Sequence, residues 1–369
     1  MLLIISYAVC ILYVTLISVF IIGWNRAKVF HNEESNSDDL LVSLIIPVRN
    51  EADNIVRLLQ ALEKQTYANL EIVLVNDHST DNTLDIISDY IAKKDNILLV
   101  DAIGQGKKNA LKEGIDNSTG QLIVCTDGDC IPQPQWIETI VNFYVENESD
   151  MIIAPVVMAY NTGFQQMQAL EFLSLQASTA GAACAGFPIM CNGANLAFTR
   201  ETWNINNDNL RNEKLSGDDM FLMMSIKKRN GKISYLKSDK AVVFTKPCNS
   251  LSEFFNQRKR WVSKSPAYYD KDVILSALIV LAISVIIILN LVFVVFVDTS
   301  YWIPLAFIFL VKIIADRILL FSFGKFVRST QLLRWILPLS IIYPFYVLYT
   351  TISGLFGSFS WKGRKSLRA

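Results

Sequence analysis

The sequence predicts an α/β domain built on a doubly wound, mainly parallel sheet, with one N-terminal and two to three C-terminal transmembrane helices. Two observations predict this architecture. Between residues 26 and 272, short apolar runs alternate with amphipathic ones, which is the pattern of a parallel sheet with helical connections. Long apolar stretches lie towards both ends, and 52% of the 369 residues are hydrophobic while 18% are charged, a small charged share for a soluble domain.

The charges are unevenly distributed, although 34 basic and 34 acidic residues cancel. From position 273 onward there are nine Lys or Arg and two Asp or Glu, so the first 272 residues contain 25 basic and 32 acidic ones. This division excludes a single evenly mixed soluble domain, and it excludes a nucleic-acid-binding protein of the strongly basic kind.

The cysteines and histidines exclude further classes of protein. Six dispersed cysteines form no CxxC pair, which argues against a disulfide scaffold and a zinc ribbon and favours a reducing compartment. With only His31 and His78, a multi-histidine metal site and a Ser-His-Asp or Cys-His catalytic group are nearly excluded. Any acid–base chemistry is therefore expected from carboxylates.

Residues 1–25 are predicted to form a transmembrane anchor. Leu2–Ile22 carry no charge and would form a helix of about 31 Å, which is enough to span a bilayer. A cleaved signal peptide is the alternative, but the segment has neither a basic start nor an A-x-A-like cleavage site. Arg26 and Lys28 follow directly, so we expect a multi-pass protein of the cell membrane with its next domain in the cytoplasm.

Residues 273–358 are the second predicted membrane region, with apolar stretches at Val273–Val297, Trp302–Phe323 and Ile336–Phe356. Three full spans would place the basic tail at 359–369 outside, against the positive-inside rule. Prolines and glycines in the last stretch favour a re-entrant or interfacial segment instead, with the tail in the cytoplasm. Asp316 and Arg317 lie inside the middle stretch, where we expect them to pair or to reach the interface rather than to serve a function.

The cytosolic domain is expected to span residues 40–247. Leu41–Ile46 is a buried apolar run that should end at Pro47, and Asn50 is the expected N-cap of a helix over 51–65. The next elements alternate, as strands at 71–75, 97–100 and 122–126 and helices at 82–93 and 107–115. In such a sheet the ligand site lies beyond the carboxyl ends of the strands.

Polar clusters follow three of these strands, at 47–51, 76–81 and 127–129. Each cluster alone is ordinary turn or cap chemistry, but three of them at one edge of a sheet are hard to explain as turns. Asp127 and Asp129 are carboxylates separated by one glycine, and such hard oxygen ligands suit Mg²⁺ or Mn²⁺ that also binds phosphate. Lys107, in a glycine-containing loop, could add a cation there or could simply be solvated.

These residues resemble the family 2 glycosyltransferases, inverting enzymes with a GT-A fold that use nucleotide-diphosphate sugars. The resemblance covers about residues 40–265 and rests on ordered motifs at Val42–Glu51, Glu71–Thr83, Gly106–Leu111, Thr126–Cys130, Asn192–Phe198, Gly217–Asp219 and Gln257–Trp261. The last motif matches the QxxRW of membrane-integrated members such as cellulose, hyaluronan and poly-N-acetylglucosamine synthases and ceramide glucosyltransferases.

The resemblance implies a role for each matching residue. The nucleotide sugar would contact Pro47, Asn50, Glu51, Asp77, Lys107 and Asp127. Within this set Asp77 would contact the base and Lys107 the nucleotide or its phosphates. The metal would be held by Asp127 and Asp129. Gly193, Ala194 and Asn195 would shape the donor-sugar or acceptor pocket. The acceptor and diphosphate site would include Gly193, Asn195, Gln257, Arg260 and Trp261.

The resemblance also makes Asp219 the general base and Asp218 its supporting carboxylate. An inverting transfer needs one such base, because the acceptor hydroxyl loses its proton as it attacks the anomeric carbon. Many relatives have Glu-Asp at this pair, whereas this chain has Asp-Asp, so the assignment between the two is open. The pair opens an apolar helix that should end near Gly231, and Asp218 is equally well explained as its cap.

Residues 248–272 are predicted to form an amphipathic interfacial helix. Ser250 and Glu253 have the spacing of a capping box. A set of basic residues precedes the first C-terminal span: Arg258, Lys259, Arg260, Lys264 and Lys271. On this pattern the helix grips anionic lipids, while the QxxRW residues of another face meet the acceptor. The small, apolar segment Phe164–Ala185 is either a helix against the membrane on the acceptor side or part of the core.

These observations predict an inverting glycosyltransferase that moves a sugar from a UDP-sugar to a lipid or lipid-linked acceptor at the inner face of the membrane. The few predicted spans leave little helix for a polymer channel, which favours this function over a processive polysaccharide synthase. A non-catalytic membrane scaffold is disfavoured because the carboxylates are intact. A soluble-type transferase that makes polyprenyl-phosphate sugars is disfavoured by QxxRW and the interfacial helix.

Overall fold

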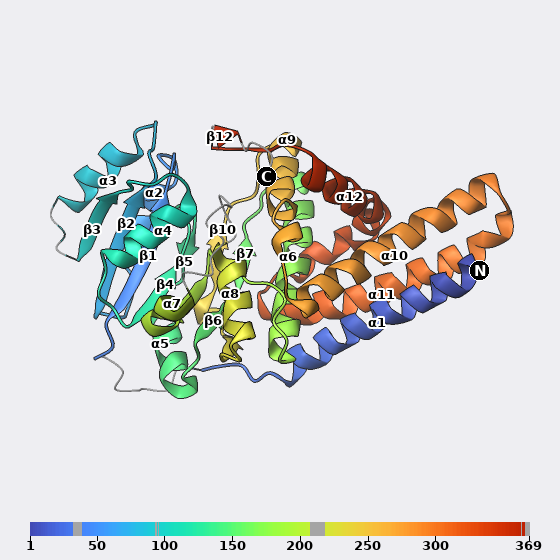
Figure 1. The fold of residues 1–369 in the computed structure, drawn as a ribbon, viewed down its shortest axis with the longest axis horizontal. Coiled ribbons are helices and arrows are strands. Elements are labelled where there is room, and N and C mark those ends of the chain that lie inside the picture. The colour runs from blue at the N-terminus through green and yellow to red at the C-terminus, as the bar shows by residue number, and fades with distance from the viewer. Residues whose placement is uncertain (32–38, 93, 95, 207–217, 363, 366–369) are drawn as a thin grey trace. The chain divides into compact units, whose positions relative to one another are not determined.

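In the computed structural model the chain divides into two compact units (Figure 1). The structure describes residues 1–31, 39–92, 94, 96–206, 218–362 and 364–365. One part, here called the sheet unit, comprises Lys28–Ala159 and Met190–Lys246. The other part, here called the helical unit, comprises Met1–Ala27, Tyr160–Ile189 and Pro247–Ala369.

The sheet unit is built on a seven-stranded sheet with the order β3-β2-β1-β4-β8-β6-β9. Its strands are β1 (Val42–Val48), β2 (Leu70–Asn76), β3 (Ile97–Asp101), β4 (Leu122–Cys125), β6 (Met151–Ile153), β8 (Leu196–Thr199) and β9 (Ile233–Tyr235). The first four strands in this order are parallel, β6 and β9 are parallel, and β8 is antiparallel to both of its neighbours. The predicted mainly parallel α/β sheet is therefore confirmed. A small second sheet has the order β5 (Ile131–Pro132), β10 (Val243–Thr245) and β7 (Val156–Met158).

The helices of the sheet unit connect these strands. They are α2 (Ile55–Leu62), α3 (Thr83–Ile91), α4 (Lys107–Asp116), α5 (Trp136–Asn147), α7 (Arg200–Asn206), α8 (Asp218–Lys228) and the short 3₁₀ helix η2 (Asp239–Ala241). In α2 the apolar residues recur at helical spacing, and Ile55, Leu58, Leu59 and Leu62 are buried. Burying this apolar stripe stabilises the helix more than its intrinsic propensity does.

Two expectations about the first strand and helix are wrong. β1 continues through Pro47, because β4 pairs with β1 only as far as Ile45 and leaves Pro47 with a single neighbouring strand. A missing N–H costs little in such an edge position. Asn50 is not the N-cap of α2, because that position belongs to Asn54. Asn50 instead adopts a left-handed backbone with φ 51°, and its Oδ1 accepts a hydrogen bond from the Thr80 amide at 2.8 Å.

The helical unit brings together segments from both ends of the chain and one from its middle. Its elements are α1 (Leu2–Arg26), α6 (Gly163–Cys184), α9 (Leu251–Val262), η3 (Ser265–Ala267), α10 (Lys271–Phe296), η4 (Thr299–Tyr301), α11 (Trp302–Phe326), η5 (Thr330–Trp335), α12 (Ile336–Phe356) and the strand pair β11 (Ser360–Trp361) and β12 (Arg364–Lys365). α1 packs against α6, α10 and α11, so α6 belongs with the apolar helices. Phe164–Ala185 is therefore helical and packs in the helical unit rather than in the core of the sheet unit.

Among the described residues, three helices are long and apolar enough to cross a membrane: Leu2–Arg26, Lys271–Phe296 and Thr330–Phe356. They indicate that the chain is associated with a membrane, with one such helix near the N-terminus and two near the C-terminus. α11 is as long but contains Lys312, Asp316 and Arg317, and it is not one of the three. The expected interruption of the last stretch is wrong, because α12 is a continuous helix of 21 residues that runs through Pro344.

The charged residues of α11 include a buried ion pair. Lys312 Nζ lies 2.5 Å from Asp316 Oδ2, and the hydroxyl of Tyr13 on α1 donates a hydrogen bond to Asp316 Oδ1 at 2.6 Å. The predicted pairing of Asp316 is confirmed, while Arg317 is exposed. Pairing and hydrogen bonding offset the cost of placing a carboxylate among apolar helices.

Candidate functional site

Charged side chains from three segments of the sheet unit converge on Gly193. Lys107, the first residue of α4, forms an ion pair with Asp127, which follows β4. The backbone amide of Gly193 donates a hydrogen bond to Asp219 Oδ2 at 3.1 Å. A Cβ atom on Gly193 would lie 3.4 Å from Lys107 Nζ and 3.6 Å from Asp219 Oδ2. The predicted phosphate, metal and base residues therefore share one site.

Asp219 lies in the first turn of α8, with its carboxylate held on both sides by backbone amides. Besides the bond from Gly193, its Oδ1 accepts a hydrogen bond from the Met220 amide at 2.9 Å. The two donors fix the orientation of the carboxylate next to Gly193. Asp218 begins the helix, but its side chain lies outside the described part of the structure, as does Gly217.

The Asp127-Gly-Asp129 turn packs closely against Val48 and Glu51, at the end of β1. A Cβ on Gly128 would lie 2.9 Å from Cγ of Glu51 and 3.2 Å from Cγ1 of Val48, so only glycine fits without a shift of these side chains. Thr126 Oγ1 donates a hydrogen bond to the Ala194 carbonyl at 2.8 Å. These contacts hold the two half-buried aspartates beside the segment that contains Gly193.

The donor set at Asp127 and Asp129 fits a hard divalent cation. In the described part of the chain, no group of three or more His, Cys, Asp or Glu side chains is arranged to hold a metal. A cation on this pair would therefore take its remaining ligands from water and from a bound phosphate, which is how Mg²⁺ commonly binds in proteins. Burial, and then the charges of Asp129 and Asp127, raise the pKa of the Cys130 thiol well above its usual value. Cys130 is thus a neutral thiol and not a nucleophile.

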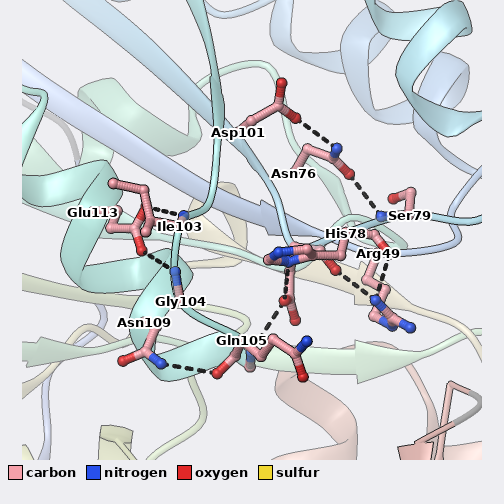
Figure 2. A network of polar contacts seen from close by, with 12 residues as sticks. Arg49, Asn76, His78, Ser79, Asp101, Ile103, Gly104, Gln105, Asn109 and Glu113 are labelled. Carbon is pink, nitrogen blue, oxygen red and sulfur yellow. Dashed lines mark hydrogen bonds and ion pairs between the residues drawn. The ribbon is translucent and has the colours of Figure 1, made fainter.

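The loops after β1 and β2 and the loop before α4 are joined by hydrogen bonds (Figure 2). Asp77 is buried, and its Oδ1 accepts a hydrogen bond from the Gly106 amide at 3.0 Å. Gly106 has φ 99°, a conformation that favours glycine, and it directly precedes Lys107. The Arg49 guanidinium donates to the carbonyls of Asp77 and His78 at 2.7 and 2.5 Å. Asp77 therefore helps to set the position of the Lys107 loop.

The outer part of the same network joins Asn76 of the 76–81 cluster to Asp101, and it includes Glu113; the sequence analysis singled out neither Asp101 nor Glu113. Asn76 Nδ2 donates to Asp101 Oδ1 at 2.7 Å, which links the ends of β2 and β3. The Glu113 carboxylate accepts from the amides of Ile103 and Gly104 at 2.7 and 2.9 Å, as Figure 2 shows. The polar residues at the strand ends marked these loops, but no sequence signal told which of them would bind the protein's own backbone.

Glu51 is fixed by its neighbours in the sheet unit and is 5% exposed. Its amide donates to Thr83 Oγ1 at 2.8 Å, and its Oε2 accepts from Asn54 Nδ2 at 2.6 Å. The Oδ1 of Asn54 in turn accepts a hydrogen bond from Lys246. Asn54 and Lys246 are further residues that the sequence analysis missed.

Asn195 has a different position from the other predicted site residues. Its side chain is fully buried, with Oδ1 accepting from Trp136 Nε1 and Nδ2 donating to the carbonyls of Pro155 and Ala241, each at 2.8 Å. The Asn195 amide thus makes these hydrogen bonds to other groups of the protein itself. The structure therefore gives Asn195 a role in holding the Gly193 segment in place.

The QxxRW residues Gln257, Arg260 and Trp261 lie on α9 in the helical unit. Ser250 caps this helix as predicted, with its Oγ accepting from the Glu253 amide at 3.2 Å, while the Glu253 side chain accepts from the Asn249 amide at 2.9 Å. The expectation that Arg258 grips lipid is wrong. Its side chain is buried against Glu171 of α6, a partner that no sequence pattern indicates.

Comparisons with known proteins show which family and fold the chain resembles. Residues 43–211 match the family model described as glycosyl transferase family 2. Glycosyltransferase AglE of Haloferax volcanii is 34% identical over 145 residues, which are 36% of this chain and 48% of the relative. Poly-beta-1,6-N-acetyl-D-glucosamine synthase of Staphylococcus epidermidis is 29% identical over 108 residues, which are 29% of this chain and 26% of that protein. The chain spans about half or less of the length of these curated relatives.

A solved structure shares the fold along most of the chain. A mannosyltransferase from Pyrobaculum calidifontis, in complex with GDP-Man and Mn²⁺, superposes with a TM-score of 0.57 at 15% identity, covering 96% of this chain and 99% of that one. At this identity the likeness concerns the fold. Residues 43–211 thus resemble a family 2 glycosyltransferase domain, and the chain has a GT-A-like fold.

Proposed function

We propose that the protein is an inverting glycosyltransferase that moves a sugar from a nucleotide-diphosphate sugar, first of all a UDP-sugar, to a lipid or lipid-linked acceptor at the membrane. One observation carries this proposal: Lys107, Asp127 and Asp219 converge on Gly193 beside the Asp127-Gly-Asp129 turn. Such a transfer requires a cationic group, a metal-binding carboxylate and a proton acceptor. Lys107, Asp127 and Asp219 would supply these three groups. The family 2 domain supports the same reaction.

The donor would lie across the ends of β1, β2 and β4. Asp77 and the segment Pro47–Glu51 would contact the nucleotide. Lys107 pairs with Asp127 in the structure. It would leave Asp127 for the diphosphate of a bound donor, because the diphosphate carries more negative charge than one carboxylate. Mg²⁺ or Mn²⁺ held by Asp127 and Asp129 would neutralise charge on the leaving diphosphate. Lys107 would supply a second positive charge to the same group, since phosphate oxygens are strong acceptors for an ammonium.

Asp219 would accept the proton of the acceptor hydroxyl as that oxygen attacks the anomeric carbon. The amides of Gly193 and Met220 hold its carboxylate still, so the base is oriented before the acceptor arrives. A positioned base contributes about 10²- to 10⁴-fold to a rate of this kind. Asp218 would support it from the preceding position.

The acceptor is proposed to be a lipid because three helices are apolar enough to span a membrane. Gln257, Arg260 and Trp261 on α9 would contact the acceptor and the diphosphate. Lys or Arg residues next to the membrane helices favour a cytoplasmic side for the sheet unit in the cell membrane. A nucleotide sugar made in the cytosol would reach the site from that side.

A processive polysaccharide synthase is the second candidate. The identity to a poly-beta-1,6-N-acetyl-D-glucosamine synthase favours it. The length of the product separates the two functions. Purified chain given radiolabelled donor should yield a single-sugar lipid under our proposal, whereas a ladder of long polymer would identify the synthase.

The donor and the metal are tested together on the purified full chain. Detergent-solubilised protein is incubated with membrane-lipid extract and radiolabelled UDP-Glc, UDP-Gal, UDP-GlcNAc or GDP-Man. We expect one UDP-sugar to label the lipid fraction, EDTA to abolish labelling, and Mg²⁺ or Mn²⁺ to restore it. Labelling by GDP-Man alone would contradict the UDP assignment, and labelling that is insensitive to EDTA would contradict the metal.

A further inference from the structure

The buried guanidinium of Arg258 joins three helices of the helical unit. Arg258 lies on α9 and is 2% exposed. Its Nε donates to Glu171 Oε1 of α6 at 3.1 Å, and a second nitrogen pairs with Glu171 Oε2, which makes the ion pair bidentate. The hydroxyl of Tyr346 on α12 also donates to Glu171 Oε1, at 2.8 Å. The guanidinium is therefore fixed in one plane.

The same guanidinium contacts two residues of the QxxRW motif. Its third nitrogen donates a hydrogen bond to Gln257 Oε1. Its central carbon lies 4.2 Å from the centre of the Trp261 ring and 4.5 Å from that of Phe254, as in cation–π contacts. Gln257 and Trp261 are thus held by one side chain from within the unit.

The contact geometry depends on a planar, forked cation. An ammonium could pair with Glu171 as a point charge, but it could not hydrogen-bond Glu171 on two sides, donate to Gln257 and stack on Trp261 at once. Although burial disfavours the charged form, the Glu171 carboxylate raises the pKa of the Arg258 guanidinium above its usual value. The Arg258 guanidinium consequently stays charged at any working pH.

We propose that Arg258 is a positioning residue, which fixes the side chains of Gln257 and Trp261 for the acceptor and diphosphate. The task given to these two residues rests on the proposed function. Their fixation by Arg258 does not, since it follows from the contacts alone. A purely structural ion pair that only joins α9 to α6 and α12 is the alternative.

The first test measures the position of Trp261 without any substrate. The full chain is labelled with 5-fluorotryptophan, and the ¹⁹F resonance of Trp261 is assigned with Trp261→Phe. We expect Arg258→Lys to shift or broaden this resonance. Arg258→Gln combined with Glu171→Gln should also shift or broaden the Trp261 resonance. This double variant leaves no unpaired buried charge, so it is less prone to unfold than a variant that removes one partner.

A matched control removes a second buried ion pair, which is found among the described residues of the helical unit. Lys312→Met combined with Asp316→Asn takes away a pair whose lysine is 3% exposed, without touching α9. The Trp261 resonance should stay unchanged in this control. An unchanged resonance in the Arg258 variants, or the same change in all variants, would overturn the proposal.

The second test is kinetic and uses the donor identified by the labelling screen. Arg258→Lys should lower kcat/KM for transfer up to about 100-fold, as expected from a misplacement near 1 Å. An equal loss of kcat/KM in the Lys312 control would show a general structural role. Wild-type chain that turns over no donor would refute the proposed function, while the ¹⁹F comparison would still decide the positioning role.

Discussion

Gly193 shows how one residue without a side chain can serve the proposed chemistry. A Cβ there would touch both Lys107 and Asp219 at ordinary contact distances, 3.4 and 3.6 Å, so Gly193→Ala should fold normally. The added methyl group would occupy the space between the cation and the base. We expect turnover to fall about tenfold or more, since small displacements at a reacting centre are costly.

The measurement compares donor turnover and melting temperature in detergent for wild type and Gly193→Ala. An unchanged melting temperature with reduced turnover supports the account. Undiminished turnover would show that the space at Gly193 is not where the transfer takes place.

Glu71 gives the stability of the sheet unit a dependence on pH. Burial of Glu71 alone would raise its pKa, but hydrogen bonds from Ser43, Thr119 and Gly120 outweigh it and hold the pKa below its usual value. A lowered carboxyl pKa stabilises the fold above the unfolded value of about 4.3, and this contribution is lost as the pH falls through the folded pKa.

Glu71→Gln should therefore be less stable than wild type at pH 7, and the difference should shrink as the pH falls below about 4.3. Urea or thermal unfolding of both proteins across this range measures it. A difference that is constant with pH would mean that the charged form of Glu71 gains nothing from its hydrogen bonds.

The site could be predicted from the sequence where chemistry depends on residue type and position in a strand pattern. Asp127 is predicted from its position after a strand and Lys107 from its glycine-containing loop, whereas the role of Asp219 is implied by the resemblance to family 2 glycosyltransferases. Asn195 and Arg258 could not be assigned in this way. Their partners, among them Trp136 and Glu171, are distant in sequence, and no local pattern reveals which polar side chain the fold will bury.

At the scale of elements, the crossing of α1 and α6 depends on two glycines. A Cβ on Gly181 would lie 2.6–2.9 Å from the Cβ, carbonyl oxygen and Cα of Phe20, and one on Gly23 would lie 2.4 Å from the Gly181 carbonyl oxygen. Backbone atoms cannot move aside as a flexible side chain can. Gly181→Val should therefore force the helices apart and destabilise the helical unit by about 1–3 kcal/mol.

Thermal unfolding in detergent measures this effect, with Gly163→Ala as a control in the same helix. A Cβ on Gly163 would meet only the Trp335 ring, at 3.5 Å, so this variant should melt like wild type. If Gly181→Val melts like the control, the close crossing of α1 and α6 is not important for stability.

The order and type of the elements in the first half of the sheet unit followed from periodicity, but some limits and groupings did not. β1 passes Pro47 because of where β4 stops pairing, and α12 passes Pro344. The end of β1 depends on the neighbouring strand β4, and the continuity of α12 depends on the helix as a whole. Neither limit can be predicted from the proline alone. The grouping of α6 with the apolar helices likewise depends on its contacts with α1 and α11.

At the scale of the whole molecule, segments far apart in sequence build each unit. The helical unit joins α1 to α10 through a hydrogen bond from Asn290 Nδ2 to Ser6 Oγ at 2.9 Å, and to α11 through Tyr13 and Asp316. The uneven charge distribution indicated this division between an acidic first part and a basic end. Charge alone could not show that α6, from the middle of the chain, belongs with both ends.

The central claim is that Asp219 is the base of a sugar transfer from a donor held by Asp127 and Asp129. The most direct measurement compares donor affinity and transfer rate for wild type, Asp219→Asn and Asp129→Asn in the purified full chain. Asp219→Asn should bind the nucleotide sugar as wild type does but transfer its sugar at least about 100-fold more slowly. Asp129→Asn should weaken donor binding in the presence of Mg²⁺ or Mn²⁺. Transfer at the wild-type rate by Asp219→Asn would contradict the account.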